Sequence, residues 1–342
     1  MNVNKKHIIT FIIVILAVFF ISAYQLPYYV YKPGGADALN PIVEVEDGYS
    51  SEGDMHLVTV RGGQVTPIQY LWAKIKPHHE LHPINEIRPE GVSEEEYYHV
   101  QLKMMDTSQE KAIAVAYKAA DKDIKIEYNG VYVVSVVKDM PADGKLQSGD
   151  RITGVDGNEV NKAEDLISYV EDKEAGDTIT LEVIRNGEEL TKTIKLDTYE
   201  KMDGKVGIGI RLVTDRGVEV DPDVSFSSGS IGGPSAGLMF SLEIYDQLMK
   251  KDLTKGYQIA GTGEVDYEGN VLRIGGIDKK VIAAAEEGCD IFFAPNGDGD
   301  EKSNYEVAKN TAEEIGTDMK IVPVKTFKDA LDYLQQLKPN KN

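Results

Sequence analysis

A glycine-rich loop with a single serine runs directly into an apolar segment of helical spacing, and this limits how the chain can fold. The loop reads Gly232-Gly233-Pro234-Ser235-Ala236-Gly237, and the apolar segment extends from Leu238 to Met249. Proline suits the first turn of a helix, so we expect a helix to begin near Pro234 with Ser235 at its N-terminus. Unpaired backbone N–H groups and the helix dipole would then favour an anionic intermediate beside the serine. The alternative interpretation is a helix-capping serine in a glycine-rich turn.

A second segment downstream carries a threonine, a glycine turn and a lysine. It contains Thr262-Gly263-Glu264 and then Gly275-Gly276-Ile277 before Lys280. Taken with the serine loop, this order resembles the proteolytic domain of Lon-type serine proteases, an α+β domain with a Ser-Lys dyad. Gly233 to Gly237 match the family's Gly-Pro-Ser-Ala-Gly, and Lys280 matches the lysine that follows its Gly-Gly-Leu turn. The resemblance therefore implies Ser235 and Lys280 as the catalytic residues.

The sequence departs from the family pattern at two positions, and neither position is Ser235 or Lys280. Gly232 stands where many members have aspartate, and Asp278 replaces the first of two lysines often found after the turn. None of the six histidines follows His99, so a Ser-His-Asp arrangement would need residues from a distant part of the chain.

A serine–lysine pair works only if the lysine is uncharged near the working pH. A serine hydroxyl is a weak nucleophile until a base removes its proton, and free lysine has a pKa of about 10.4. Burial and a helix N-terminus both lower that pKa, by roughly 3–5 units in full burial. Lys280 falls near the start of a helix expected over 278–286, whereas Lys279 lies about 100° around it and should face water. The resemblance implies that Thr262 fixes Lys280 by a hydrogen bond. The alternative for Lys280 is a surface lysine.

The N-terminus predicts a membrane anchor. Lys5 and Lys6 precede an uncharged apolar run from Ile8 to Ala23. As a helix the run is about 24 Å long, and the tyrosines that follow can extend it into the membrane interface. The lysines should hold that end in the cytoplasm and leave the catalytic part outside a bacterial cell. A cleaved signal peptide is the alternative, for which Ile21-Ser22-Ala23 is a poor cleavage site.

Composition limits the partners and cofactors. The net charge of −20 argues against binding to nucleic acid. The sequence holds no Gly-x-x-x-x-Gly-Lys-Ser/Thr phosphate loop, so we expect an ATP-independent protein. Cys289 is the only cysteine, which rules out an intrachain disulfide. His78-His79-Glu80-Leu81-His82 lacks zinc-ligand spacing, so we expect no metal and no cofactor. The oligomeric state stays open.

Short strands and turns characterise residues 124–196. Ser148-Gly149-Asp150-Arg151-Ile152, continuing through Asp156-Gly157, resembles the PDZ domains appended to bacterial proteases. PDZ domains bind a peptide as an added strand and hold its carboxylate in a backbone nest. The matching loop is Tyr128, Asn129, Gly130 and Val131, which departs from the usual Gly-Leu-Gly-Phe. A spacer domain without a ligand is the alternative.

The remaining pattern completes an α+β organisation. We expect a helix over 66–76 with Ile68, Leu71, Trp72 and Ile75 on one face, and two helical pieces between 93 and 119 that divide near Asp106. The predicted parts are a cytoplasmic tip and anchor (1–29), the first part of the proteolytic domain (30–115), the PDZ domain (116–200) and the catalytic part (201–342). The PDZ domain is then inserted into the proteolytic fold or stands in line with it.

These features together predict a membrane-anchored, extracytoplasmic serine endopeptidase that cuts peptides or flexible protein segments. The PDZ domain would select or position the substrates. The alternative from another class is a PDZ scaffold on the outer membrane face with an inactive protease-like domain. A cytosolic peptidase with a buried N-terminal helix conflicts with the lysine-flanked apolar run.

Overall fold

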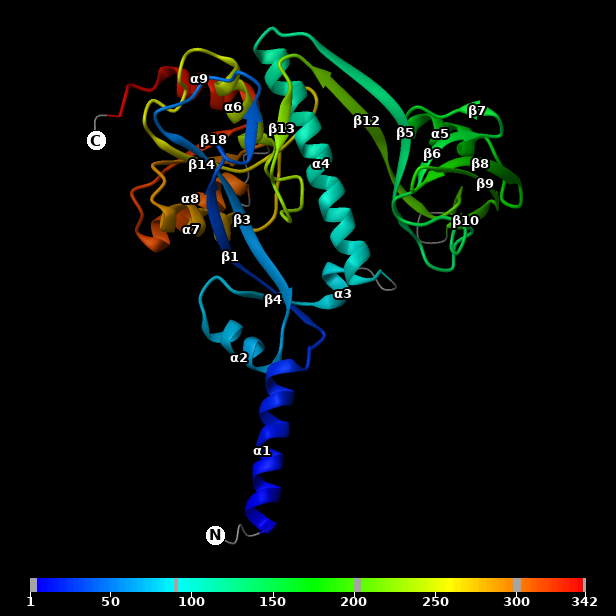
Figure 1. Cartoon of the computed structure of the whole chain (residues 1–342), viewed down its shortest axis with the longest axis horizontal. Helices are drawn as coiled ribbons and strands as arrows, with labels where there is room; N and C mark the ends of the chain where they lie inside the picture. The colour runs from blue at the N-terminus through cyan, green and yellow to red at the C-terminus, as the bar shows by residue number, and fades with distance from the viewer. Residues whose placement is uncertain (1–4, 89–91, 200–203, 298–302, 341–342) are drawn as a thin grey trace.

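The computed structural model describes residues 5–88, 92–199, 204–297 and 303–340 (Figure 1). A helix projects from one end of the folded part, which divides into a mixed α/β body and a smaller β-rich unit at its side. The helices are α1 (Lys5–Ala23), α2 (Pro67–Ile75), α3 (Ile84–Ile87), α4 (Glu94–Ala119), α5 (Ala163–Glu171), α6 (Gly237–Leu248), α7 (Ile277–Glu287), α8 (Asn304–Ile315) and α9 (Phe327–Gln336).

The strands fall into two larger sheets and three short pairs. They are β1 (Tyr28–Ala38), β2 (Val43–Val45), β3 (Asp54–Gln64), β4 (Glu80–Pro83), β5 (Ile124–Val136), β6 (Arg151–Val155), β7 (Asn158–Glu159), β8 (Thr178–Arg185), β9 (Glu188–Lys195), β10 (Asp197–Tyr199), β11 (Lys205–Gly207), β12 (Ile210–Val220), β13 (Val224–Phe226), β14 (Gln258–Gly261), β15 (Glu264–Val265), β16 (Val271–Leu272), β17 (Ile291–Pro295) and β18 (Lys320–Val324).

The sheet of the α/β body joins strands from both ends of the chain. Its order is β18-β17-β14-β3-β1-β4. β14 pairs in parallel with β3 and with β17, and β17 with β18, while β1 runs antiparallel to β3 and β4. Residues 28–83 and 258–324 therefore build one sheet, although the β-rich unit separates them in the sequence.

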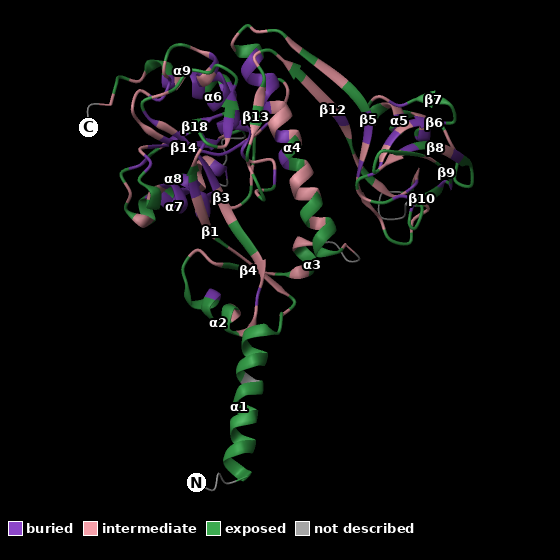
Figure 2. Ribbon diagram, in the orientation of Figure 1, coloured by how far each residue is buried: buried purple, intermediate pink, exposed green. Residues whose placement is uncertain are grey.

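Helices cover both faces of this sheet. One face carries Met55, Leu57 and Phe293, which pack with α6 and α9 in the larger core. The other face carries Val58 and Phe292, which pack against α7 and α8. Successive strand residues point to opposite faces, so neighbours such as Phe292 and Phe293 enter different cores. Figure 2 shows the resulting concentration of buried residues around α6, α7 and the central strands.

The β-rich unit is attached through a two-stranded ribbon. β5 and β12 pair antiparallel along their length, from Ile124↔Val220 near α4 to Val136↔Ile210 in the unit. The sheet order is β12-β5-β6-β8-β9, with β7 beside β6, around its own apolar core. Asp150 is fully buried there and receives both Nε and Nη2 of Arg185, at 2.6 and 2.8 Å.

The structure corrects two predictions about helices, one for α4 and one for α6. α4 is a single helix rather than two pieces, because the Ser108 side chain donates to Pro234 O (2.9 Å) instead of capping a new helix. α6 begins at Gly237, three residues after Pro234. The domain boundary expected between 200 and 201 lies outside the described residues, and the division into domains stays a prediction.

α1 is the helix among the described residues that is long and apolar enough to cross a membrane. No described part of the apolar stretch of α1 is buried against the rest of the protein. The expected helix over 66–76 is observed as α2, with a capping box between Thr66 and Gln69.

Candidate active site

The loop before α6 holds Ser235 by contacts on both sides. Gly233 adopts a φ of +92°, which favours glycine, and its N–H donates to Gln101 O at 2.8 Å. Beyond the serine, Gly263 N–H donates to Ser235 O at 2.9 Å. Since Gln101 belongs to α4 and Gly263 follows β14, the nucleophile loop is fixed by two elements distant from it in sequence.

Lys280 reaches the same serine from α7. Its Nζ lies 2.5 Å from Ser235 Oγ and 2.9 Å from Thr262 Oγ1. Thr262 Oγ1 in turn donates to Ser235 O at 2.9 Å. Because that bond uses the threonine proton, the threonine oxygen accepts from the amine. A neutral amine held in this way directs its lone pair toward Ser235 Oγ.

Burial makes the amine a base. Lys280 is only 4% exposed, and no carboxylate of the described residues pairs with it, in contrast to Lys279. Desolvation lowers the pKa of Lys280 to about 7. An amine with this pKa is about half neutral at pH 7, so a large share of it can abstract a proton, as a general base must.

Two backbone N–H groups beside the serine are free to bind an oxyanion. Within the described ranges, Ser235 and Ala236 donate their N–H groups to no other residue. They lie directly before α6, whose positive dipole end faces the loop. Paired N–H groups at a helix N-terminus suit the negative charge that develops during acyl transfer.

The expectation that Lys279 faces water is wrong. Its side chain is fully buried, and its Nζ lies 2.9 Å from Asp278 Oδ2 and 3.0 Å from Glu80 Oε2. α7 packs between the sheet and α8, so neighbouring helix positions are both covered. The two adjacent lysines thus differ in charge environment, since Lys279 has carboxylate partners.

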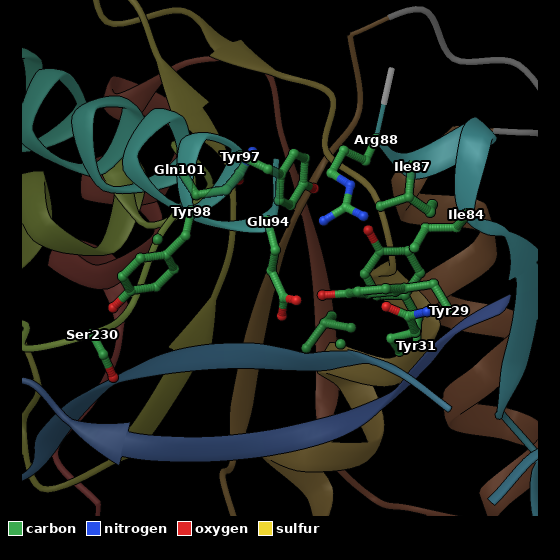
Figure 3. Close-up of a pocket in the computed structure, with 14 residues that line it drawn as sticks. Tyr29, Tyr31, Ile84, Ile87, Arg88, Glu94, Tyr97, Tyr98, Gln101 and Ser230 are labelled. Atoms are coloured by element: carbon green, nitrogen blue, oxygen red, sulfur yellow. The ribbon is translucent and has the colours of Figure 1, made fainter. Parts of the chain in front are cut away.

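An aromatic cavity of about 510 Å³ adjoins the nucleophile loop (Figure 3). Tyr29 and Tyr31 line it from β1, and Tyr97 and Tyr98 from α4. Its far wall includes Ser230 and Gly232, just before Ser235. Desolvation by burial is the largest cause that raises the pKa of Tyr29. No local sequence pattern predicts this cavity, because its walls come from segments that are far apart in the chain.

The four residues expected to hold a peptide carboxylate, Tyr128, Asn129, Gly130 and Val131, do not form a loop. They lie in the middle of β5. Val131 pairs with Thr214 of β12 on one side and Ile152 of β6 on the other. The backbone there is occupied by the ribbon, so it offers little to a peptide.

A different groove lies between α5 and β12, with a cavity of about 860 Å³. Leu166, Ile167 and Val170 line it from α5, and residues 205–212 line it from the other side. β12 is the terminal strand of its sheet. The run Gly207-Ile208-Gly209-Ile210 has glycine at the two glycine positions of Gly-Leu-Gly-Phe, a signal that the sequence analysis missed.

Two family models match parts of the chain. Residues 100–196 match the model of the PDZ domain, and residues 218–336 match that of the Lon protease (S16) C-terminal proteolytic domain. The second range contains Ser235, Thr262 and Lys280.

The matches to individual Lon proteases cover only a small part of those proteins. The Lon protease of Metamycoplasma arthritidis is 36% identical over 106 residues, 31% of this chain and 12% of that protein. The Lon protease of Campylobacter jejuni is 30% identical over 181 residues, 46% of this chain and 22% of that protein. The chain thus matches less than a quarter of either relative. The PDZ domain of the SdrC-like protein from Listeria monocytogenes is 40% identical, covers 26% of this chain and 93% of its own, and has a TM-score of 0.24.

Proposed function

Because the chain carries a PDZ domain and a Lon-type proteolytic domain, we propose that it is a serine endopeptidase with Ser235 as nucleophile and Lys280 as general base. The contact of 2.5 Å between the buried Lys280 amine and Ser235 Oγ is the observation that carries the proposal. A lysine without a carboxylate partner, at a pKa of about 7, is suited to remove the serine proton.

The same groups account for both halves of the reaction. Ser235 Oγ attacks the scissile carbonyl while Lys280 takes its proton, and the N–H groups of Ser235 and Ala236 hold the oxyanion. The ammonium then donates the proton to the leaving amine, so an acyl-serine remains. Lys280 next removes a proton from a water molecule as this water attacks the acyl carbonyl. The ammonium then returns the proton to Ser235 Oγ as the ester bond breaks, which releases the acid and restores the hydroxyl. Thr262 keeps the amine oriented throughout.

The aromatic cavity beside the loop supports the proposal that the substrate is extended and carries an apolar or aromatic side chain near the cut bond. Its tyrosines supply broad apolar surface, and such surface gains most from burying a side chain of the same kind. A peptide must be locally unfolded to reach both the cavity and Ser235. The substrates we propose are therefore peptides and flexible protein segments, cut without ATP.

The PDZ unit supports substrate selection at the groove between α5 and β12. A peptide can add there as a strand along the open edge of β12, with its carboxylate near Gly207–Ile210. We place the PDZ domain as an insertion in the proteolytic fold, because strands before and after it pair in one sheet. α1 anchors the chain as a single span, with the catalytic part extracytoplasmic.

Incubation with an unstructured protein tests the proposal. Ser235→Ala and Lys280→Ala should each abolish cleavage. Ser241→Ala is the matched control, since Ser241 is a buried serine of α6 that donates only to Gly237 O. Equal cleavage by the Ser235→Ala and wild-type proteins would refute the dyad. Binding without cleavage by any of the proteins would favour the scaffold.

A further inference from the structure

The helix α2 exposes a complete apolar face. Ile68, Leu71, Trp72 and Ile75 are 44%, 62%, 57% and 80% exposed. Their spacing puts all four on one side of the helix. The opposite side packs on the protein through Ala73, which is buried. The face that the sequence would assign to a core is therefore turned outward.

α2 is fastened to the end of α1. Leu26 N–H donates to Val65 O at 2.8 Å, Val65 N–H donates to Tyr28 O at 3.0 Å, and Gln64 Nε2 donates to Leu26 O at 2.9 Å. These bonds join the residues just after α1 to those just before α2. Figures 1 and 2 show α2 at the junction of α1 and the folded body, which lies wholly beyond that end of α1.

The polar residues of α2 suit the surface of a bilayer. α2 carries lysine at position 74 and no acidic residue, and Lys76 follows as its C-cap. Lys74 Nζ lies 4.8 Å from the Tyr70 ring centre, and Lys76 Nζ lies 5.8 Å from that of Trp72. Tyrosine, tryptophan and lysine are the side chains that gather at the headgroup level. This local positive charge stands out in a chain of net charge −20.

We propose that α2 lies in the interface of the membrane that α1 spans, with its apolar face in the acyl boundary. The inference rests on the proposed anchoring by α1. Amphipathic helices with lysine and aromatic residues bind lipid surfaces in this way. A second attachment beside the anchor holds the proteolytic body at a fixed height and orientation, so cleavage is restricted to substrate segments near the membrane surface.

Trp72 is the only tryptophan of the chain, so its fluorescence reports on this face alone. The full chain carrying Ser235→Ala, which spares the scaffold protein from cleavage, is placed at one copy per nanodisc of mixed zwitterionic and anionic lipids, made with a scaffold protein that lacks tryptophan. We expect brominated lipids to reduce Trp72 emission about twofold, as for an indole at headgroup depth. The variant Ile68→Ser/Leu71→Ser/Ile75→Ser should lose most of this quenching. Tyr49→Ser, which alters an exposed aromatic residue away from α1, should keep it.

Other outcomes would overturn the inference. Unquenched Trp72 in a chain that has inserted α1 shows that α2 stands clear of the lipid. If quenching of Trp72 by brominated lipids weakens as the number of copies per disc rises, the apolar face of α2 binds a second copy of the chain instead of lipid. A chain that fails to insert contradicts the proposed anchoring. Cleavage retained by the Ser235→Ala chain, with Trp72 quenched as expected, contradicts only the proposed dyad, because the quenching does not depend on peptidase activity.

Discussion

Replacing Lys280 by methionine should stabilise the proteolytic body near neutral pH while abolishing hydrolysis. Folding lowers the pKa of this amine from an ordinary 10.5 to about 7. A lysine whose pKa falls on folding destabilises the fold wherever the unfolded chain would hold the proton. This penalty is absent above the unfolded pKa, grows as the pH falls below that value, and levels off once the pH has fallen through the folded pKa. Methionine has a similar shape and no proton to lose.

The magnitude follows from the two pKa values. At about 1.4 kcal/mol per unit, the penalty is about 4 kcal/mol near pH 7, where the folded amine is half-protonated. Near pH 9 the folded amine is neutral and the penalty is about 2 kcal/mol. Between pH 7 and pH 9, the free energy of unfolding of the wild type should therefore rise by about 2 kcal/mol relative to that of the variant. The hydrogen bonds of the Lys280 amine change with its protonation state, and the two pKa values already include that change, so the pH dependence isolates the amine.

Hydrogen exchange of the α6 and α7 amides measures this difference at each pH, after correction for intrinsic exchange rates. Ser235→Ala keeps the buried amine, so it should retain the wild-type pH dependence despite losing activity. An identical pH dependence for Lys280→Met and wild type would refute the reasoning. In the same range, kcat/KM of wild type should rise with an apparent pKa of about 7 and fall roughly tenfold per pH unit below it.

Three further predictions concern the threonine, the PDZ core and the groove. Thr262→Val should lower kcat by about tenfold with little change in KM, since it removes the hydroxyl that orients Lys280; steady-state kinetics on one peptide checks this. Arg185→Met should destabilise the PDZ unit by about 3 kcal/mol, because it leaves the buried Asp150 carboxylate unpaired; calorimetry should show one transition shifted and the other retained. Gly209→Val should weaken peptide binding by at least about tenfold, measured by fluorescence anisotropy, because at its φ of +79° a Cβ would lie 2.1 Å from Met140 Cβ and distort the groove.

The resemblance of two short motifs predicted the proposed pairing of Ser235 with Lys280, and local chemistry predicted several helices. Ser235 and Lys280 sit in motifs whose glycines and proline define tight turns, and such turns depend on residues adjacent in sequence. The start of α2 was also predictable from neighbouring residues, because Thr66 and Gln69 form its capping box. The apolar run of α1 is continuous, so it needs no partner to be recognised.

The PDZ groove shows where local patterns failed. The glycine-containing run near Tyr128 predicts a carboxylate loop, yet it lies in the centre of β5, because β6 and β12 pair with it from both sides. Strand pairing between residues 131 and 214 joins two strands that the rest of the same unit separates in sequence. No pattern within one segment specifies that pairing.

The sequence was sufficient to identify a proteolytic segment with Ser235 and Lys280, a PDZ segment and an apolar N-terminal helix. Periodicity also grouped the residues of each helix face correctly. It could not say what covers a face, since burial depends on elements that meet only when the sheet assembles. That assembly buried Lys279 beside Glu80, turned the apolar face of α2 outward, and brought the Lys280 amine to the serine hydroxyl.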